Sequence, residues 1–327
     1  MNTQELVYLR RFAKLTCFAT LFLIFAGAMV NSTGSGLAVP DWPTSYGNWY
    51  FVPMVGGVFY EHGHRLIAQA VGLLTVVLAI WLKRKDPRKW MHVLGFCAVG
   101  AVIIQGILGG ITVLFYLPTA ISTLHGVLAQ SFFILTIIIV YSLSKERTGR
   151  LNLTADAECL PLIKPALLFT AIVFVQLIMG AIMRHSGSGL AIYDFPKMAG
   201  QWIPTFDRDM LFVLNDWRFE NNLDPVNMTQ VVLHFIHRVG AVIVLIGLGL
   251  IHSKFLKYAK NNKLIKQSII ILTGLIVVQV SLGIATVLTV KTPVIASLHV
   301  LVGAITLGFS VLLVLRAMPT SLAKLKL

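Results

Sequence analysis

Four of the nine histidines stand near the start of long apolar segments, in two pairs that repeat along the chain. His64 and His125 lie in the first half, and His237 and His299 lie at matching places in the second half. An ionisable side chain at membrane depth is costly and indicates a function by default. A lone histidine could simply hydrogen-bond a neighbouring helix, but two repeated pairs make that explanation weak.

Two imidazoles that face each other across a helix bundle are the arrangement that heme iron uses with two axial histidines. The heme ring is flat and apolar, and the cores of helix bundles commonly hold such cofactors. We therefore predict one heme between His64 and His125 and a second heme between His237 and His299. Small residues near these positions would let a ring approach: Gly106, Gly109, Gly110, Gly126, Gly240 and Gly283.

A single carboxylate distinguishes the two predicted pockets. Glu61 precedes His64 by three residues, so both side chains share one face of a helix. The matching position before His237 is His234, which is not an acid. We predict that Glu61 exchanges a proton in its pocket, which would make one heme a substrate and the other a cofactor. The alternative is a carboxylate that caps its helix at the water interface.

Arg65 and Arg238 each follow a predicted iron ligand directly. Their guanidinium groups suit carboxylates, so they could contact heme propionates, or they could instead extend to the membrane surface. His62 adjoins the site but points about 100° away from it around the helix. The sequence assigns no role to the other histidines: His92, His185, His234 and His252.

The elements that must position these residues are membrane-spanning helices. Of the 327 residues, 57% are hydrophobic and 12% are charged, and the mean hydropathy is +0.81, which excludes an ordinary soluble domain. A net charge of +14 would suggest nucleic acid in a soluble protein, but here we predict no nucleic-acid partner. Apolar runs of spanning length fall at roughly 12–30, 61–82, 92–114, 119–143, 163–184, 229–252, 266–289 and 294–316.

The basic residues predict the orientation of these eight spans. Twenty of the 27 Lys and Arg residues lie in the terminal segments and the alternate loops that eight spans would place on one side. The long loop 31–60 on the other side contains no Lys or Arg. Both termini are therefore expected to be cytoplasmic, with the heme pockets toward the outer side. The first apolar run is too long for a signal peptide.

The chain also repeats itself. Residues 27–43 read GAMVNSTGSGLAVPDWP and residues 180–196 read GAIMRHSGSGLAIYDFP, with nine of 17 positions identical. Each half has an even number of spans, so the fold class is all-α, with two tandem four-helix bundles related by a pseudo-two-fold axis along the membrane normal. We place the halves at 1–150 and 151–327. The shared GSGLA is expected to form a tight turn.

These motifs resemble those of the heme A synthases. The resemblance rests on GSGLAVPDWP, EHGHR at 61–65, STLHG at 122–126, HFIHR at 234–238 and ASLHV at 296–300, and it covers essentially the whole chain. Many bacterial members carry a cysteine pair in the first outer loop, which this chain lacks, so it resembles the cysteine-free type. The three cysteines, Cys17, Cys97 and Cys159, are expected to form no disulfide.

The resemblance implies an oxidoreductase that converts the C8 methyl group of heme O to the formyl group of heme A, for cytochrome oxidase biogenesis. It implies that the substrate heme lies between His64 and His125, that a heme B cofactor lies between His237 and His299, and that Glu61 is the catalytic residue. Heme O would come from heme O synthase, and heme B would pass electrons to an acceptor that the sequence does not identify. A homo-oligomer is left open.

Two other functions compete with this one. A diheme b-type electron-transfer cytochrome explains the four histidines equally well, but it does not explain why a glutamate stands in only one pocket. A heme transporter is suggested by the parallel repeat, and it would hold its ligand weakly without changing it. The short segment before the first span does not resemble a transit peptide, which favours a bacterial cell membrane over a mitochondrial one.

Overall fold

A computed structural model describes residues 3–49, 51–150 and 159–318. Within these ranges the chain is helical, with two isolated β-bridges and no strand. The helices are α1 (Thr3–Ser32), α2 (Gly57–Lys85), α3 (Lys89–Leu114), α4 (Thr119–Leu143), α5 (Lys145–Arg150), α6 (Leu160–His185), η2 (Ser188–Leu190), α7 (Arg208–Glu220), α8 (Met228–Tyr258), α9 (Lys263–Leu288) and α10 (Pro293–Ala317).

Eight of these helices are long and apolar enough to cross a membrane, which confirms the predicted spans. They are α1–α4, α6 and α8–α10, and several run beyond the apolar segments. α1 begins at Thr3 rather than near 12, and α8 continues to Tyr258 rather than ending near 252. Basic side chains near Tyr258 explain the extension of α8, because their apolar stems tolerate the membrane surface and their charges favour a helix C-terminus, whereas Glu5 favours the N-terminus of α1. The protein is thus a multi-pass membrane protein.

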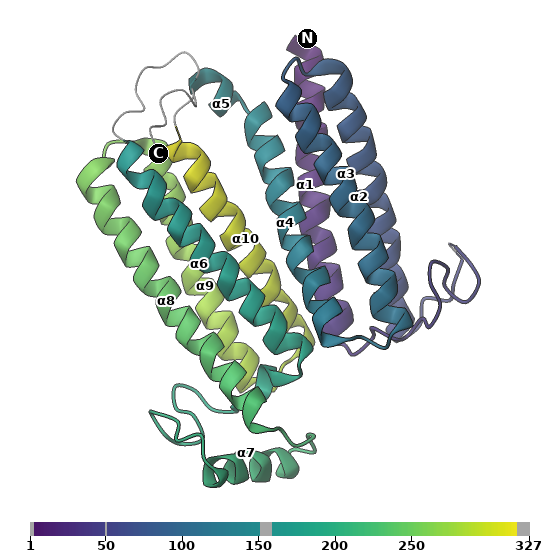
Figure 1. Cartoon of the computed structure of the whole chain (residues 1–327), viewed down its shortest axis with the longest axis vertical. Coiled ribbons are helices and arrows are strands. Elements are labelled where there is room, and N and C mark those ends of the chain that lie inside the picture. Colours follow the sequence, from purple (N-terminus) through teal and green to yellow (C-terminus); the bar gives the residue numbers. More distant parts are fainter. Residues whose placement is uncertain (1–2, 50, 151–158, 319–327) are drawn as a thin grey trace.

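The spans form two groups of four, α1–α4 and α6 with α8–α10 (Figure 1). In the first group α1 contacts α2 and α4, and α3 contacts the same two helices; in the second group α6 and α9 each contact α8 and α10. The groups meet through α1 and α4 on one side and α6 and α10 on the other. The pairing repeats between the groups, while the pseudo-two-fold axis stays a prediction. The predicted boundary at 150/151 adjoins residues outside the described ranges.

Each group packs its own apolar core. The first core includes Leu9, Leu82 and Phe132, and the second includes Leu162, Phe169 and Leu272. Cys159 stands directly before α6 and is buried in the second core. Each bundle therefore holds its helices by its own apolar contacts, as an independent site in each would require.

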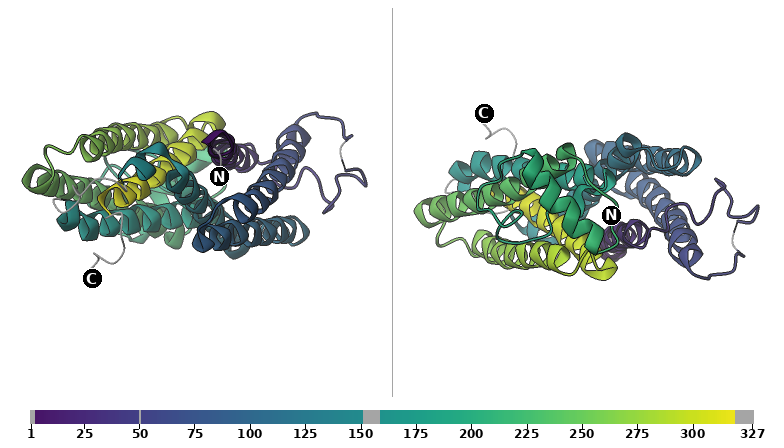
Figure 2. Two further views of the ribbon diagram at one scale, coloured as in Figure 1. Left: turned by 90° about the horizontal axis from the view of Figure 1, so that it is seen from above. Right: turned by 90° about the horizontal axis from the view of Figure 1, so that it is seen from below.

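Two long segments lie at one end of the molecule, opposite the start of α1 (Figure 1). We call this the loop end; it contains residues 33–56 between α1 and α2, and residues 186–227 between α6 and α8. The first segment extends to the side of its helix group (Figure 2). The second contains α7, which the sequence analysis missed. Met210 and Leu214 bury one face of α7 on a third core with Ile192, and Asp207 caps its N-terminus.

The GSGLA segments form the tight turns that their glycines predicted. Gly34 and Gly187, at matching positions, have φ angles of 67° and 71°, in the left-handed region that favours glycine. The backbone amide of Ser35 then donates to the carbonyl of Val30 at 2.9 Å and closes the end of α1. These turns bring the chain back over the helix ends.

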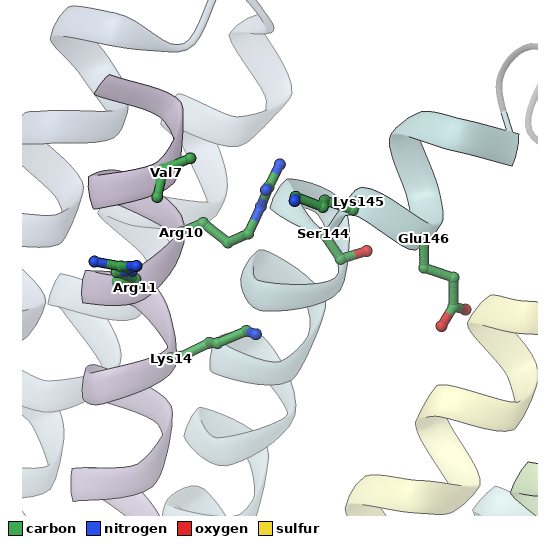
Figure 3. Close-up of a pocket in the computed structure, with 7 residues that line it drawn as sticks. All are labelled: Val7, Arg10, Arg11, Lys14, Ser144, Lys145 and Glu146. Atoms are coloured by element: carbon green, nitrogen blue, oxygen red, sulfur yellow. The ribbon is translucent and has the colours of Figure 1, made fainter. Parts of the chain in front are cut away.

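A cleft of about 420 Å³ opens at the other end of the molecule. Figure 3 shows Arg10 and Lys145 directed toward each other across it, while Glu146 turns toward α10. Glu146 pairs there with Arg316 at 2.7 Å. This cleft lies at the opposite end from the four predicted iron ligands and is separate from the candidate site. Its lining residues are Val7, Arg10, Arg11, Lys14, Ser144, Lys145 and Glu146.

Candidate functional site

The four predicted iron ligands lie toward the loop end of four different spans. His64 is on α2, His125 on α4, His237 on α8 and His299 on α10, and all four are half-buried. Because α2 and α4 both contact α1 and α3, they stand at opposite corners of the first group. α8 and α10 are related in the same way in the second group. Each histidine pair therefore faces across the middle of a four-helix bundle.

A glycine on a neighbouring helix makes room for each histidine ring. A Cβ atom on Gly27 would lie 2.9 Å from Cε1 of His64, and one on Gly180 would lie 3.1 Å from Cε1 of His237. The corresponding distances to His125 and His299 are 3.4 Å from Gly109 and 3.0 Å from Gly283. A methyl group at Gly27, Gly180 or Gly283 would push the ring aside, whereas one at Gly109 would make an ordinary contact. The sequence analysis named Gly109 and Gly283 among the small residues near the histidines. It missed Gly27 and Gly180, although these two glycines are the first residues of the repeated segments.

The other predicted glycines serve different neighbours. Gly110 lies against the Trp42 ring, Gly126 faces Ala181, and Gly106 has no atom within 4 Å of the position that a Cβ atom would take. Gly240 lies against the side-chain amide of Gln176, so its small size accommodates that amide rather than a bound ring.

The second histidine pair has a spacing that fits one metal ion between two imidazoles. The ring centroids of His237 and His299 are 6.5 Å apart and the rings are inclined by 73°. A histidine nitrogen binds a metal at about 2 Å, and a ring nitrogen lies about 1.1 Å from its own centroid, so two opposed ligands give roughly 6.3 Å. The donor set and its spacing therefore fit a heme with two axial histidines.

The evidence that His64 and His125 suit a heme is different, because it comes from their unpaired ring nitrogens. His64 interacts electrostatically with His125, and the Nδ1 atom of each is buried without a hydrogen-bond partner among the described residues. A buried polar nitrogen without a partner is destabilising by about 1–3 kcal/mol. A group that binds both rings and reorients them would relieve that cost, which is what a bound heme would do.

Side-chain amides orient the second pair more fully than the first. The Gln176 amide donates to the carbonyl of His237 at 2.9 Å and contacts its Nδ1 at 3.2 Å. Nδ1 of His299 donates to the carbonyl of Gln279 at 3.1 Å. Hydrogen bonds of this kind fix the orientation of a ligating imidazole. The repeat places Leu23 where the second half has Gln176, so His64 lacks this support.

Glu61 lies beside the first pair and is almost fully buried, with 3% of its surface exposed. One carboxylate oxygen accepts the backbone amide of Val39 at 2.7 Å, and the other accepts Arg65 at 2.5 Å. The pair with Arg65 spans one helical turn, a spacing that favours ion pairs. The loop and the arginine thus fix the position of the Glu61 carboxyl group in a buried environment, where it can stabilise positive charge or accept a proton.

His234 occupies the same place in the second half. Its Nδ1 atom accepts the backbone amide of Ile192 at 3.1 Å, and its Nε2 atom faces Arg238 at 3.3 Å. The repeat aligns Ile192 with Val39, so an imidazole replaces a carboxylate within one hydrogen-bonding arrangement. At this position the two pockets therefore differ by one side chain, which is a carboxylic acid in the first pocket and an imidazole in the second, as the sequence predicted.

Arg65 and Arg238 bind the loop-end segments back onto the helices. Arg65 donates to the carbonyls of Asp41 and Thr44, each at 2.7 Å. Arg238 donates to the carbonyl of Asp194 at 2.8 Å. Several donors of each guanidinium are therefore already used. Their contact with heme propionates stays a prediction.

His62 has a role in the loop that its helical position did not reveal. Its Nδ1 atom lies 2.8 Å from the hydroxyl of Ser45, and both residues are buried. Arg65 also reaches Ser45, at 3.4 Å. The second half has Phe235 and Met198 at these positions, so this polar contact is particular to the first half. His185, expected in a loop, is instead the last residue of α6.

The comparisons with known proteins agree on one family. Residues 10–311 match the family COX15-CtaA, described as cytochrome oxidase assembly protein. The chain is 29% identical to the heme A synthase of Halalkalibacterium halodurans over 300 residues, which is 91% of this chain and 93% of that protein. It is 28% identical to the heme A synthase of Rickettsia massiliae over 327 aligned positions, covering 90% of this chain and 93% of that protein.

Proposed function

The chain belongs to the COX15-CtaA family of cytochrome oxidase assembly proteins, and from this premise we propose that it acts as a heme A synthase. It is then an oxidoreductase that converts the C8 methyl group of heme O to the formyl group of heme A. The observation that carries the proposal is the exchange of Glu61 for His234 within otherwise matching hydrogen bonds. An electron-transfer protein with two equivalent hemes has no need of such a difference.

The two pockets have separate tasks in this proposal. His64 and His125 hold the iron of heme O, which is the substrate, and His237 and His299 hold heme B, which is the cofactor. Two observations support this division. The second pair has the spacing of two ligands on one iron, and the Gln176 side-chain amide and the Gln279 backbone carbonyl orient its two rings. In the first pair both Nδ1 atoms are buried without a hydrogen-bond partner among the described residues, as expected for a pocket whose ligand comes and goes.

The reaction takes four electrons and four protons from the methyl group and one water molecule. Heme B, when bound, supplies a route for electrons toward an acceptor that is still unidentified. Glu61 stabilises the positive charge that develops at the methyl carbon, or accepts the proton of the attacking water. Arg65 holds the carboxylate in place through its 2.5 Å contact. The backbone amide of Val39 fixes the second oxygen in the same way.

The proposal also includes the membrane in which the protein resides and the source of its heme O. The protein resides in a bacterial inner membrane with both termini in the cytoplasm, because the basic residues gather at the end of the molecule where α1 begins. The pockets then open toward the outer side. Heme O synthase supplies the substrate from within the membrane.

Expression in a host that makes heme O but no heme A tests the proposal. Hemes extracted from the purified wild type and from Glu61→Ala are separated by chromatography and identified by mass. We expect heme B with heme A or a hydroxylated heme O from the wild type, and heme B with unreacted heme O from Glu61→Ala. His234→Ala is the matched control and should still form heme A.

Each rival function has its own outcome in this experiment. Two heme B molecules per chain in all samples would leave a diheme cytochrome as the better account. Heme O that binds loosely and leaves unchanged from every variant would instead support a transporter.

A further inference from the structure

Arg184 carries a positive charge into the boundary between the two helix groups. It lies on α6 and is half-buried, and its guanidinium donates to the carbonyl of Ala28 at 2.5 Å and to the hydroxyl of Ser32 at 2.8 Å. Both partners are neutral and belong to α1. No carboxylate forms an ion pair with Arg184 within the part of the chain that the structure describes. A half-buried cation whose hydrogen-bond partners are all neutral is costly, which indicates that an anionic ligand binds there.

The contacts of Arg184 place it on the loop-end side of the second histidine pair. Ser32, which accepts from Arg184, also accepts from the hydroxyl of Ser297 at 2.9 Å. Ser297 is fully buried and precedes His299 on α10 by two residues. Arg184 and His299 also interact electrostatically. An anionic group attached to a ring bound at His299 would thus lie within reach of Arg184.

Lys291 adds a second positive charge at the same end of this pocket. Its aliphatic stem lies over the turn after α6, 3.6 Å from the position that a Cβ atom on Gly189 would take. It interacts electrostatically with Arg184 and with His234. Lys291 is exposed at the loop end, and partial desolvation together with the charges of Arg218 and Arg184 lowers its pKa. Arg184 and Lys291 thus lie close together, and neither forms an ion pair with a carboxylate among the described residues.

The first half has neither charge. The repeat aligns Arg184 with Asn31 and Lys291 with Leu117. Leu117 lies over the corresponding turn, 3.2 Å from the position that a Cβ atom on Gly36 would take, and has the same left-handed backbone as Lys291. The backbone is therefore alike in the two halves, while the charge differs. Apart from Arg65, which already pairs with Glu61, no cation among the described residues corresponds to this cluster in the first half.

We propose that Arg184 and Lys291 bind the two carboxylates of the heme held by His237 and His299, and that this charge difference makes the second pocket retain its heme while the first exchanges its own. The inference rests on the proposed function, since it assumes a resident heme in one pocket and a substrate in the other. A heme has two propionates, which match the two additional charges in number. Charge-assisted hydrogen bonds are the strongest available to such groups.

A structural role for Arg184 makes a different prediction. The contacts with Ala28 and Ser32 join α6 to α1, and their loss could loosen the helix packing without any effect specific to carboxylates. The test must therefore vary the carboxylates of the ligand as well as the protein. Heme and its dimethyl ester provide that comparison, because the ester keeps the iron and the ring but has no charge at the propionates.

The first measurement is the release of resident heme from the full-length protein in detergent. The host makes no heme O, and an excess of apomyoglobin captures the heme that leaves, which is followed by its absorbance. We expect Arg184→Gln/Lys291→Gln to release heme about 10- to 100-fold faster than the wild type, from the loss of one or two charge-assisted bonds. Arg11→Gln/Lys14→Gln, which removes two charges at the opposite end, should leave the rate unchanged.

The second measurement adds heme or its dimethyl ester to protein freed of heme, and records binding by absorbance. The wild type should bind heme at least about tenfold more tightly than the ester, and Arg184→Gln/Lys291→Gln should bind both equally. Equal binding by the wild type overturns the inference even if the double variant does not fold. Suppose that the wild type carries heme at His237 and His299, and that Arg184→Gln/Lys291→Gln releases it at the same rate. That result overturns this inference but leaves the proposed function standing. A wild type that binds no heme overturns the proposed function with it.

Discussion

The two loop-end segments fold onto their helix groups in the same way. The carboxylate of Asp41 accepts the backbone amides of Tyr46 and Gly47, and the carboxylate of Asp194 accepts those of Ala199 and Gly200, all between 2.7 and 3.0 Å. An isolated β-bridge follows in each, from Ser45 to Asn48 and from Met198 to Gln201. The two halves therefore share hydrogen bonds as well as sequence. Each residue in one half can be compared with the residue at the matching position in the other half.

Against this shared arrangement, the differences concern proton chemistry in one half and ligand orientation in the other. Glu61 in the first half corresponds to His234 in the second. Leu23 and Ile67 in the first half correspond to Gln176 and Gly240 in the second, where the glycine leaves room for the amide that orients His237. One scaffold thus separates a reactive pocket from a supporting one through a few side chains.

Removal of a predicted iron ligand should have the largest effect, because it should abolish heme binding in one pocket and leave the other pocket unchanged. We expect His64→Ala to abolish the binding of heme O while the resident heme stays at one per chain. His237→Ala should instead lose the resident heme. Heme extraction with identification by mass measures both. If either variant lost both hemes while remaining folded, the two pockets would not be independent.

Glu61→Gln should have the next largest effect, on turnover alone. A lost proton acceptor lowers a rate by about 10²- to 10⁴-fold, whereas the amide keeps the hydrogen bonds to Val39 and Arg65 nearly intact. His234→Gln makes the matching change in the other half and should alter turnover by less than about threefold. Conversion of heme O by purified protein measures the rates. Equal losses in the two variants would contradict the assignment of chemistry to the first pocket.

The glycines beside the histidines offer a graded test of the ring positions. A methyl group on Gly27 would approach His64 to 2.9 Å, whereas one on Gly109 would approach His125 to 3.4 Å, an ordinary contact. We expect Gly27→Ala to weaken heme O binding about 10-fold or more, as overpacking costs about 1–3 kcal/mol, and Gly109→Ala to have little effect. Binding titrations followed by absorbance would show the order. The reverse order would mean that the rings lie elsewhere when a ligand binds.

The smallest effect is expected at Asp41, in the first loop-end segment. Burial alone would raise the pKa of Asp41, but hydrogen bonds from Thr44, Gly47 and Tyr46 lower it from 3.8 to about 2. Because the folded pKa lies below the unfolded value, the carboxylate contributes stability above about pH 4 that is lost as the pH falls toward 2. Asp41→Asn should lower the melting temperature slightly at pH 7, and the difference should shrink by pH 3. A difference that does not depend on pH would contradict this account.

The sequence predicted the elements well because their signals are strong and local. Each span is a run of apolar residues bounded by polar segments, and the membrane requires helices there. The turns at Gly34 and Gly187 were predicted because glycine accepts a left-handed backbone at little cost. The pairing of His64 with His125 followed from the repeat, and the structure gives both a place at the loop end of diagonal helices.

The features that the sequence did not predict depend mostly on contacts between segments that are distant in the chain. α7 is short and only partly apolar, although Asp207 before Met210 and Leu214 was a recognisable start signal. The contacts of Arg65 with Asp41 and Thr44 could not be predicted, because they depend on how the loop folds back over α2. Arg184 stood opposite Asn31 in the aligned repeat, but only its position between α6 and α1 gave that difference a meaning.

The central claim is that the first pocket holds a substrate and the second holds a cofactor. The most direct test expresses the wild-type chain in a host without heme O and titrates the purified protein with heme O under anaerobic conditions. We predict one tightly bound heme B per chain before the titration and uptake of one heme O per chain during it, with no heme B displaced. Two heme B molecules per chain with no uptake of heme O, or heme O that displaces heme B, would contradict the account.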